Sequence, residues 1–279
     1  MFHTIQQLYG GIVRKSLYLH PVKGTDMEKL AGKVKYIAFD ADDTLWVNEP
    51  YFREAEARYC ALLARFAPPQ EIIDTLYQTE LKNLAPYGYG AKAFTLSLME
   101  TAIGFSNKYS GVHPRNSSGE DSLQSTYPLT PDEMAEVISI GTSLINVPME
   151  ILPGVEQLLK KLHESGKYRL IVATKGDLLD QNRKLQRSGL YKYFHHVEVM
   201  YDKNGNTYSK LFEKLNCKPH EFLMIGNSMK SDILPVLNTG GNGIYIPFHS
   251  TWEHEKVEGE VSHPNLYTCT SCEELLEIF

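Results

Sequence analysis

The 279-residue sequence has few cysteines, and they are scattered. Only Cys269 and Cys272 lie close together, and Cys60 and Cys217 do not form a second pair at matching spacing. A structural zinc site needs four such ligands, so we do not expect one. Few, scattered thiols fit the reducing cytoplasm, where we expect the protein to act.

Long hydrophobic runs and an excess of positive charge are also lacking. No apolar run approaches the roughly 20 residues that span a bilayer, and the first 20 residues do not have the pattern of a signal peptide. The net charge of −6 argues against a nucleic-acid partner, because such proteins usually carry a basic surface. We therefore expect neither a membrane nor a nucleic acid as a partner. A small anionic substrate stays possible, since local lysines or a metal can override the overall charge.

Short apolar runs of strand length alternate with helical patterns over much of the chain. The runs lie at residues 34–39, 169–173, 197–201, 222–225 and 243–246. One helical pattern, at 155–162, follows Pro153-Gly154 and ends before Gly166, as helix boundary signals should. Strands separated by helices predict an α/β fold with a Rossmann-like parallel sheet and right-handed crossovers.

The interval 48–149 contains helical patterns and no strand signal. Apolar residues share one helical face over 52–66, residues 93–103 also look helical, and Thr130 to Glu133 form a capping box. We predict an all-α cap domain at 48–149, inserted into a core domain that comprises residues 31–47 and 150–279. Within the cap, the polar composition of residues 106–127 predicts a loop. Residues 1–30 form an N-terminal extension to which the sequence assigns no role.

Polar residues follow the first four of the apolar runs. In chain order they are Asp40, Asp42, Thr174, Lys175, Lys203, Asn227 and Asp232. The carboxyl ends of parallel strands meet at one edge of a sheet, where ligands bind, so these side chains should converge. Neighbouring carboxylates repel each other unless a cation lies between them, and an oxygen-rich set without sulfur suits Mg²⁺. The sequence thus predicts a magnesium site at this edge.

These motifs resemble those of the haloacid dehalogenase-like hydrolase superfamily. The segment FDADDTL matches the first motif, Thr174 after its apolar run matches the second, and Lys203 matches the third. The segment GNSMKSD resembles the fourth, which usually carries two acids. The helical insert after the first motif resembles the branch with an α-helical cap. The resemblance covers roughly residues 33–279 in order and spacing.

The resemblance implies a magnesium-dependent phosphohydrolase that acts on a small phosphorylated metabolite. Asp40 would attack phosphorus and form an aspartyl-phosphate, and Asp42 would act as general acid and then as general base. Thr174 and Lys203 would bind the phosphoryl group. The metal would bind the side chains of Asp40 and Asp232 and the backbone carbonyl of Asp42.

Asn227 departs from the family pattern, because an acid often stands at this position. An amide oxygen can still bind the metal or a metal-bound water, but it carries no negative charge. We therefore expect weaker magnesium binding rather than loss of activity.

Several further residues are candidates for the site on weaker sequence signals. Lys210 is a rival for the role of Lys203, but its helical pattern places it toward solvent. Lys175 and Lys92 are candidates for substrate binding, and the glycine-rich turn at 86–92 either reaches the crevice or simply joins two helices. A metal site at His249, Trp252 and His254 is less expected than a packed tryptophan beside solvent-facing histidines.

Other functions are compatible with the same fold. A haloacid dehalogenase shares the nucleophile, but it usually does not have an acid at the position of Asp42. A sugar phosphomutase would return the phosphoryl group to its product, and the motifs do not exclude it. A catalytically silent binding or scaffold protein would not need the complete set of site residues. We expect a monomer or a homodimer.

Overall fold

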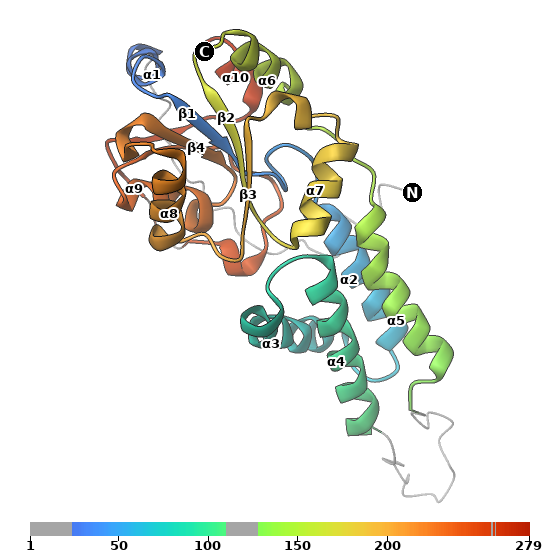
Figure 1. Cartoon of the computed structure of the whole chain (residues 1–279). Coiled ribbons are helices and arrows are strands. Elements are labelled where there is room, and N and C mark those ends of the chain that lie inside the picture. Colours follow the sequence, from blue (N-terminus) through green and yellow to red (C-terminus); the bar gives the residue numbers. More distant parts are fainter. Residues whose placement is uncertain (1–23, 110–127, 258, 260) are drawn as a thin grey trace, which may run out of the picture.

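The computed structural model describes residues 24–109, 128–257, 259 and 261–279. A layered α/β part lies at one end of the molecule and a group of helices at the other (Figure 1). None of the helices in the described ranges combines the length and the apolar composition that a bilayer span requires.

Six parallel strands form one sheet in the order β3-β2-β1-β4-β5-β6. Their bounds are β1 Tyr36–Phe39, β2 Arg169–Lys175, β3 His196–Met200, β4 Phe222–Gly226, β5 Asn242–Tyr245 and β6 Leu266–Thr268. The first five coincide with the predicted apolar runs, and the sixth was not predicted. The prediction of an α/β fold with a parallel sheet is confirmed.

Helices cover both faces of the sheet. Their bounds are α1 Gly24–Ala31, α6 Val155–Glu164, α7 Leu178–Arg187, α8 Gly205–Leu215, α9 Leu234–Asn238 and α10 Cys272–Leu275. The shorter helical turns are η3 Tyr191–Tyr193, η4 Pro219–Glu221, η5 Met229–Ile233 and η6 Glu253–Glu255. Side chains of α1, α6 and α10 belong to one hydrophobic cluster, and those of α8 and α9 to another. The sheet therefore lies between two helical layers.

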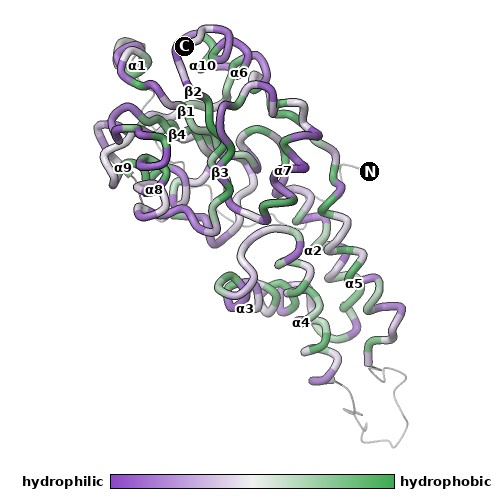
Figure 2. The backbone as a smooth tube through the Cα atoms, viewed as in Figure 1, coloured by the Kyte–Doolittle hydropathy of each residue, from purple (hydrophilic) through white to green (hydrophobic). Residues whose placement is uncertain are grey.

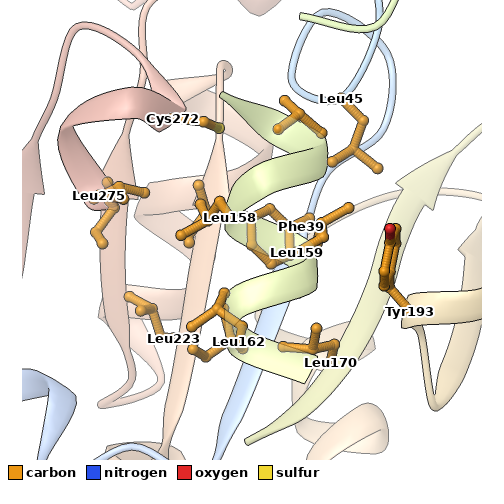
Figure 3. Close-up of a cluster of buried hydrophobic side chains, with 14 of the residues drawn as sticks. Phe39, Leu45, Leu158, Leu159, Leu162, Leu170, Tyr193, Leu223, Cys272 and Leu275 are labelled. Carbon is orange, nitrogen blue, oxygen red and sulfur yellow. The ribbon is translucent and has the colours of Figure 1, made fainter. Parts of the chain in front are cut away.

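Side-chain alternation along β1 explains why this strand is buried on both faces. Ile37 and Phe39 belong to the first cluster, whereas Ala38 belongs to the second. Figure 3 shows Phe39 beside Leu158 and Leu159, which α6 presents to the sheet. Figure 2 shows hydrophobic residues concentrated along the central strands.

The close pair of cysteines is part of this packing. Cys269 and Cys272 are buried thiols in the same cluster as Leu275. Gly154, at the start of α6, has a φ of 77°, and a Cβ there would lie 2.6 Å from the backbone nitrogen of Glu273. The α10 segment thus packs directly against the start of α6.

Four helices lie between β1 and β2 and form the helical insert. Their bounds are α2 Glu49–Leu63, α3 Pro69–Tyr87, α4 Ala91–Tyr109 and α5 Pro131–Ser143, followed by the turn η2 Leu144–Asn146. They enclose a hydrophobic cluster of their own. The capping box is formed, because the Glu133 amide donates to Thr130 Oγ1 at 3.2 Å. The insert falls within the predicted cap at 48–149, whose limits as a domain stay a prediction.

Two other expectations meet the structure only in part. Helix α4 continues to Tyr109, so the first four residues of the predicted loop at 106–127 are helical, and residues 110–127 lie outside the described ranges. Of the predicted extension at 1–30, residues 1–23 also lie outside them. Helix α1 buries Met27 and Leu30 against the core, so the end of the extension is part of the α/β unit.

The two segments that connect the insert to the core lie side by side. Trp46 and Ile151 form an antiparallel bridge, and the Val47 amide donates to the Glu150 carbonyl at 2.9 Å. The chain therefore enters and leaves the insert at one place, next to the carboxyl end of β1.

Candidate active site

A cavity of about 190 Å³ lies between the carboxyl ends of the strands and the helical insert. The predicted site residues that line it are Asp40, Asp42, Thr174, Lys175, Lys203, Asn227 and Asp232. The insert contributes residues of α2, α3 and α4, among them Phe52, Arg53, Glu56 and Glu80. The size suits a small molecule, and polar groups of both parts face it.

Asp40, Lys203 and Asp232 form a buried cluster at the strand ends. The Lys203 ammonium donates to Oδ1 of Asp40 and, at 2.6 Å, to Oδ1 of Asp232. All three residues are less than a tenth exposed. Lys210 is exposed on α8, so Lys203 is the lysine that reaches Asp40.

The charges in this cluster do not balance. Burial raises the pKa of Asp40 to about 7, although Lys203 opposes the shift. Burial by itself would lower the pKa of Lys203, but the carboxylates of Asp232 and Asp40 raise it above its ordinary value. Two carboxylates share one ammonium, so one negative charge is left without a partner in a buried place.

A tight turn of the chain brings Asp232 to the end of β4. The Ser228 amide donates to Asp232 Oδ2 at 2.9 Å, and the turn η5 carries the carboxylate back over the strand. A Cβ on Gly226 would lie 2.3 Å from Asp232 Oδ2, so only glycine leaves room for this approach. Asn227 accepts a hydrogen bond from Thr44 Oγ1 at 3.1 Å.

The residues present fit a hard divalent cation. Oxygens of Asp40, Asp232, Asn227 and the Asp42 backbone are the candidate ligands, and the uncompensated charge beside Asp40 favours a cation there. Among the described residues, no three acids, histidines or cysteines converge as a ready-made metal cluster. A metal would therefore have only two carboxylates and would need waters and substrate oxygens, as Mg²⁺ commonly does.

Three side-chain donors hold the carboxylate of Asp42. Trp46 Nε1 and Gln181 Nε2 each donate to its carboxylate at 2.7 Å, and Lys184 Nζ donates to it at 3.0 Å. The sequence interpretation missed Gln181 and Lys184. Both lie on α7, which begins just after the second motif, and their spacing of three residues puts them on one helix face. That spacing was the available signal.

The next acid, Asp43, has a structural role. Its φ of 61° is left-handed, and its Oδ1 accepts the amides of Asn48 and Glu49 at 2.8 and 3.0 Å. Burial raises its pKa to about 8. Asp43 thus links the first motif to the start of α2.

The second motif supplies one buried hydroxyl and one lysine. Thr174 is 1% exposed and lines the cavity. Lys175 donates to Ser231 Oγ at 2.8 Å, forms an ion pair with Glu255 and lies 4.1 Å above the Tyr89 ring. Burial alone would raise the pKa of Glu255, but Lys175 and two serine hydroxyls lower it to about 2. Glu255 ends the turn η6, which follows β5, and the sequence interpretation also missed it.

The turn at 86–92 reaches the cavity through Gly88, Tyr89 and Gly90. Lys92, however, is not among the lining residues, because its ammonium donates to Asp177 at 2.9 Å on the half-exposed surface. Its role in substrate binding stays a prediction. Trp252 is packed edge-on against Tyr89 and also lines the cavity.

Comparison with known proteins identifies relatives over most of the chain. The family model for haloacid dehalogenase-like hydrolases matches residues 34–237. A glyceraldehyde 3-phosphate phosphatase of Pyrococcus furiosus is 23% identical over 88% of this chain and 93% of its own length. One of Methanothermobacter thermautotrophicus is 32% identical over 41% of this chain and 54% of its own.

Solved structures give the same result. A haloacid dehalogenase-like family hydrolase from Xanthomonas campestris is similar with a TM-score of 0.70 and 29% identity, over 88% of this chain and 91% of that one. A HAD phosphatase from Thermococcus onnurineus is similar in fold, with a TM-score of 0.53 and 18% identity, over 88% and 97% of the two chains.

Proposed function

The chain belongs to the haloacid dehalogenase-like hydrolase family, and from this premise we propose that it is a phosphatase that hydrolyses a small phosphomonoester through an aspartyl-phosphate on Asp40. The observation that carries the proposal is the buried cluster of Asp40, Lys203 and Asp232 at the base of the cavity, with Asp42 two residues after Asp40. The relatives named as glyceraldehyde 3-phosphate phosphatases support a small phosphorylated metabolite as substrate.

In the first step, Asp40 attacks phosphorus and the bond from phosphorus to the ester oxygen breaks. Asp42, in its protonated form, gives a proton to the leaving alkoxide. The Lys203 ammonium next to Asp40 balances negative charge that builds up on the phosphoryl oxygens, and the Thr174 hydroxyl donates to one of them.

In the second step, Asp42 is a carboxylate and takes a proton from water. The water oxygen attacks the phosphorus of the aspartyl-phosphate, which releases phosphate and restores Asp40. Magnesium, held by Asp40, Asp232, Asn227 and the Asp42 carbonyl, would supply the positive charge that lets an anionic ester approach an anionic carboxylate.

Substitution of the nucleophile tests this function. Asp40→Asn should lower hydrolysis of p-nitrophenyl phosphate by roughly a thousandfold or more, because an amide is not a nucleophile here. Wild-type activity should also fall when EDTA removes divalent ions and return with added magnesium. Acid-quenched wild-type protein should carry phosphate on the peptide that contains Asp40.

Lys210→Met is a matched control, because Lys210 is an exposed lysine outside the cavity. It should hydrolyse p-nitrophenyl phosphate at the wild-type rate. A wild-type rate in Asp40→Asn, with its thermal unfolding unchanged, would remove Asp40 from the nucleophile role.

A further inference from the structure

The positive charges in the cavity lining are already paired with carboxylates. Each cationic side chain that lines the cavity within the described residues already has a carboxylate partner. The pairs are Arg53 with Glu49 and Glu56, Lys175 with Glu255, Lys184 with Asp42, and Lys203 with Asp40 and Asp232. A second anionic group on a substrate would therefore have to displace one of these carboxylates.

Among the described residues, Arg53 is the only cation in the insert wall, the part of the cavity lining that α2, α3 and α4 supply, and both edges of its guanidinium are occupied. Its Nε donates to Glu49 Oε1 at 2.9 Å, and its NH1 donates to Glu56 Oε2 at 2.6 Å. Glu49 and Glu56 come four residues before and three residues after Arg53 on α2. Both acids are buried, so α2 itself neutralises its arginine, without any ligand.

Glu80 adds a third carboxyl group from α3. Glu49 and Glu56 thus pair directly with the Arg53 guanidinium, and Glu80 interacts with it electrostatically. Burial raises the pKa of Glu56 to about 7 and that of Glu80 to about 8; the charge of Glu49 raises both pKa values further, and the charge of Arg53 opposes both shifts. Below these pKa values the carboxyl groups are neutral; above them they are carboxylates, which accept hydrogen bonds from hydroxyl or ammonium groups and repel an anion.

Aromatic rings line the same part of the cavity. Phe52 and Phe94 pack edge to face, with ring centroids 5.1 Å apart, and Tyr89 and Trp252 do the same at 6.2 Å. Such rings contact the carbon atoms of a leaving group, and their negative faces also attract an ammonium group.

We propose that this wall selects phosphate esters whose leaving group carries hydrogen-bond donors and no negative charge, with Glu56 and Glu80 as the specificity-determining residues. The proposal rests on the proposed phosphatase function. A polyol and an amino alcohol share the required chemistry, and a hydroxy acid does not.

A matched pair of substrates tests the proposal. Glycerol 3-phosphate and 3-phosphoglycerate differ in one end group, a hydroxymethyl group in the first and a carboxylate in the second. At about pH 9, where both acids are ionised, we expect kcat/KM to be higher for glycerol 3-phosphate by roughly tenfold or more, because like charges repel in a partly buried site. Ethanolamine phosphate, as a third substrate, distinguishes an ammonium from a hydroxyl as the preferred donor.

Inhibition gives a second readout for the same pair. Each compound is also measured as a competitive inhibitor of p-nitrophenyl phosphate hydrolysis, so that a compound that binds without turnover is still ranked. Glycerol 3-phosphate should have the lower inhibition constant. Equal or better binding and turnover of 3-phosphoglycerate would overturn the proposal.

Variants assign the selectivity to the two acids. Glu56→Gln and Glu80→Gln keep the side-chain shape and, at this pH, remove a negative charge, so each should lower the preference for glycerol 3-phosphate at least severalfold. Glu54→Gln removes an exposed acid from the same helix and should keep the wild-type preference. An unchanged preference in both pocket variants would refute the assignment.

The proposed function can fail separately. If p-nitrophenyl phosphate is not hydrolysed in an Asp40-dependent way, the phosphatase proposal is wrong. If it is hydrolysed but the matched substrates are ranked in the opposite order, only the selectivity proposal is wrong.

Discussion

Lys184 donates to both carboxylate oxygens of Asp42, at 3.0 and 3.3 Å, and to the side chain of Asn48 at 2.9 Å. Asn48 directly precedes α2, the first helix of the insert. The ammonium is buried, so it connects the proposed acid–base residue to the start of the insert through contacts that solvent screens little.

Loss of the Lys184 ammonium should impair proton transfer to the leaving group. In Lys184→Met, kcat/KM for an alkyl phosphate should fall roughly 10- to 100-fold, because Asp42 is no longer held in position for general acid catalysis. Hydrolysis of p-nitrophenyl phosphate should fall less, since p-nitrophenolate leaves without a proton. Lys184→Arg should recover part of the loss. Equal losses for both substrates would indicate a merely structural role.

Asn227→Asp should strengthen magnesium binding. The substitution adds a negative charge beside Asp232, and a carboxylate can still accept the hydrogen bond from Thr44. The magnesium concentration that gives half the maximal rate should fall, whereas Asn227→Ala should raise it. The measurement is initial rate against magnesium concentration. An unchanged value in Asn227→Asp would contradict the placement of Asn227 at the metal.

Glu80 should make stability depend on pH. Burial raises the pKa of Glu80 from 4.5 to about 8, so between these values the folded chain holds a proton that the unfolded chain releases. This stabilisation is complete below the unfolded pKa and is lost as pH rises through the folded pKa, by about 1.4 kcal/mol per pH unit at most. The charges of Glu56 and Glu49 add to this rise in pKa, whereas Arg53 and a hydrogen bond with Trp252 oppose it.

The glutamine in Glu80→Gln does not ionise. The free energy of unfolding of this variant, relative to wild type, should therefore increase as pH rises from 4.5 to about 8. Thermal unfolding of both proteins across the window measures the difference. Glu54→Gln, at an exposed position, should follow the wild-type curve. A parallel pair of curves for Glu80→Gln and wild type would contradict the raised pKa.

Gly141 should be required where α4 and α5 meet. A Cβ at this position would lie 2.9 Å from the backbone Cα of Thr95, which cannot move independently of its helix. Gly141→Ala should therefore destabilise the protein by roughly 1–3 kcal/mol. Gly104 on α4 is exposed and has open space around it, so Gly104→Ala should stabilise by roughly 0.5–1 kcal/mol. Similar unfolding curves for the two variants would contradict the close contact.

Local sequence patterns predict the sheet and the residues at its edge because both depend on short segments. Asp40 follows a run whose alternate side chains enter opposite layers, and parallel strands bring such positions together. Strand β6 was missed because its three residues are half-buried and form no apolar run. Backbone contacts define it, such as that of the Cys269 amide with the Tyr245 carbonyl at 3.0 Å.

The side chains that surround Asp42 and Lys175 could not be predicted in the same way. Lys184 reaches Asp42 only because α7 is rotated with that face toward the strand ends, and packing sets this rotation. Glu255 reaches Lys175 from the turn η6 after β5, and tertiary contacts rather than a local pattern determine the position of this turn. The charge pairing of Arg53 had an i, i+3 and i, i+4 signal, but its place at the cavity required the structure.

The bridge between Trp46 and Ile151 has an evolutionary consequence. The polypeptide leaves the sheet and returns to it through two adjacent segments. The whole helical insert can therefore be replaced as one unit while the strand ends keep their arrangement. Recombination at these two connecting segments would change substrate recognition and leave the catalytic reaction at the strand ends intact. Chimaeras joined at these two segments are therefore a rational route to enzymes with new selectivity.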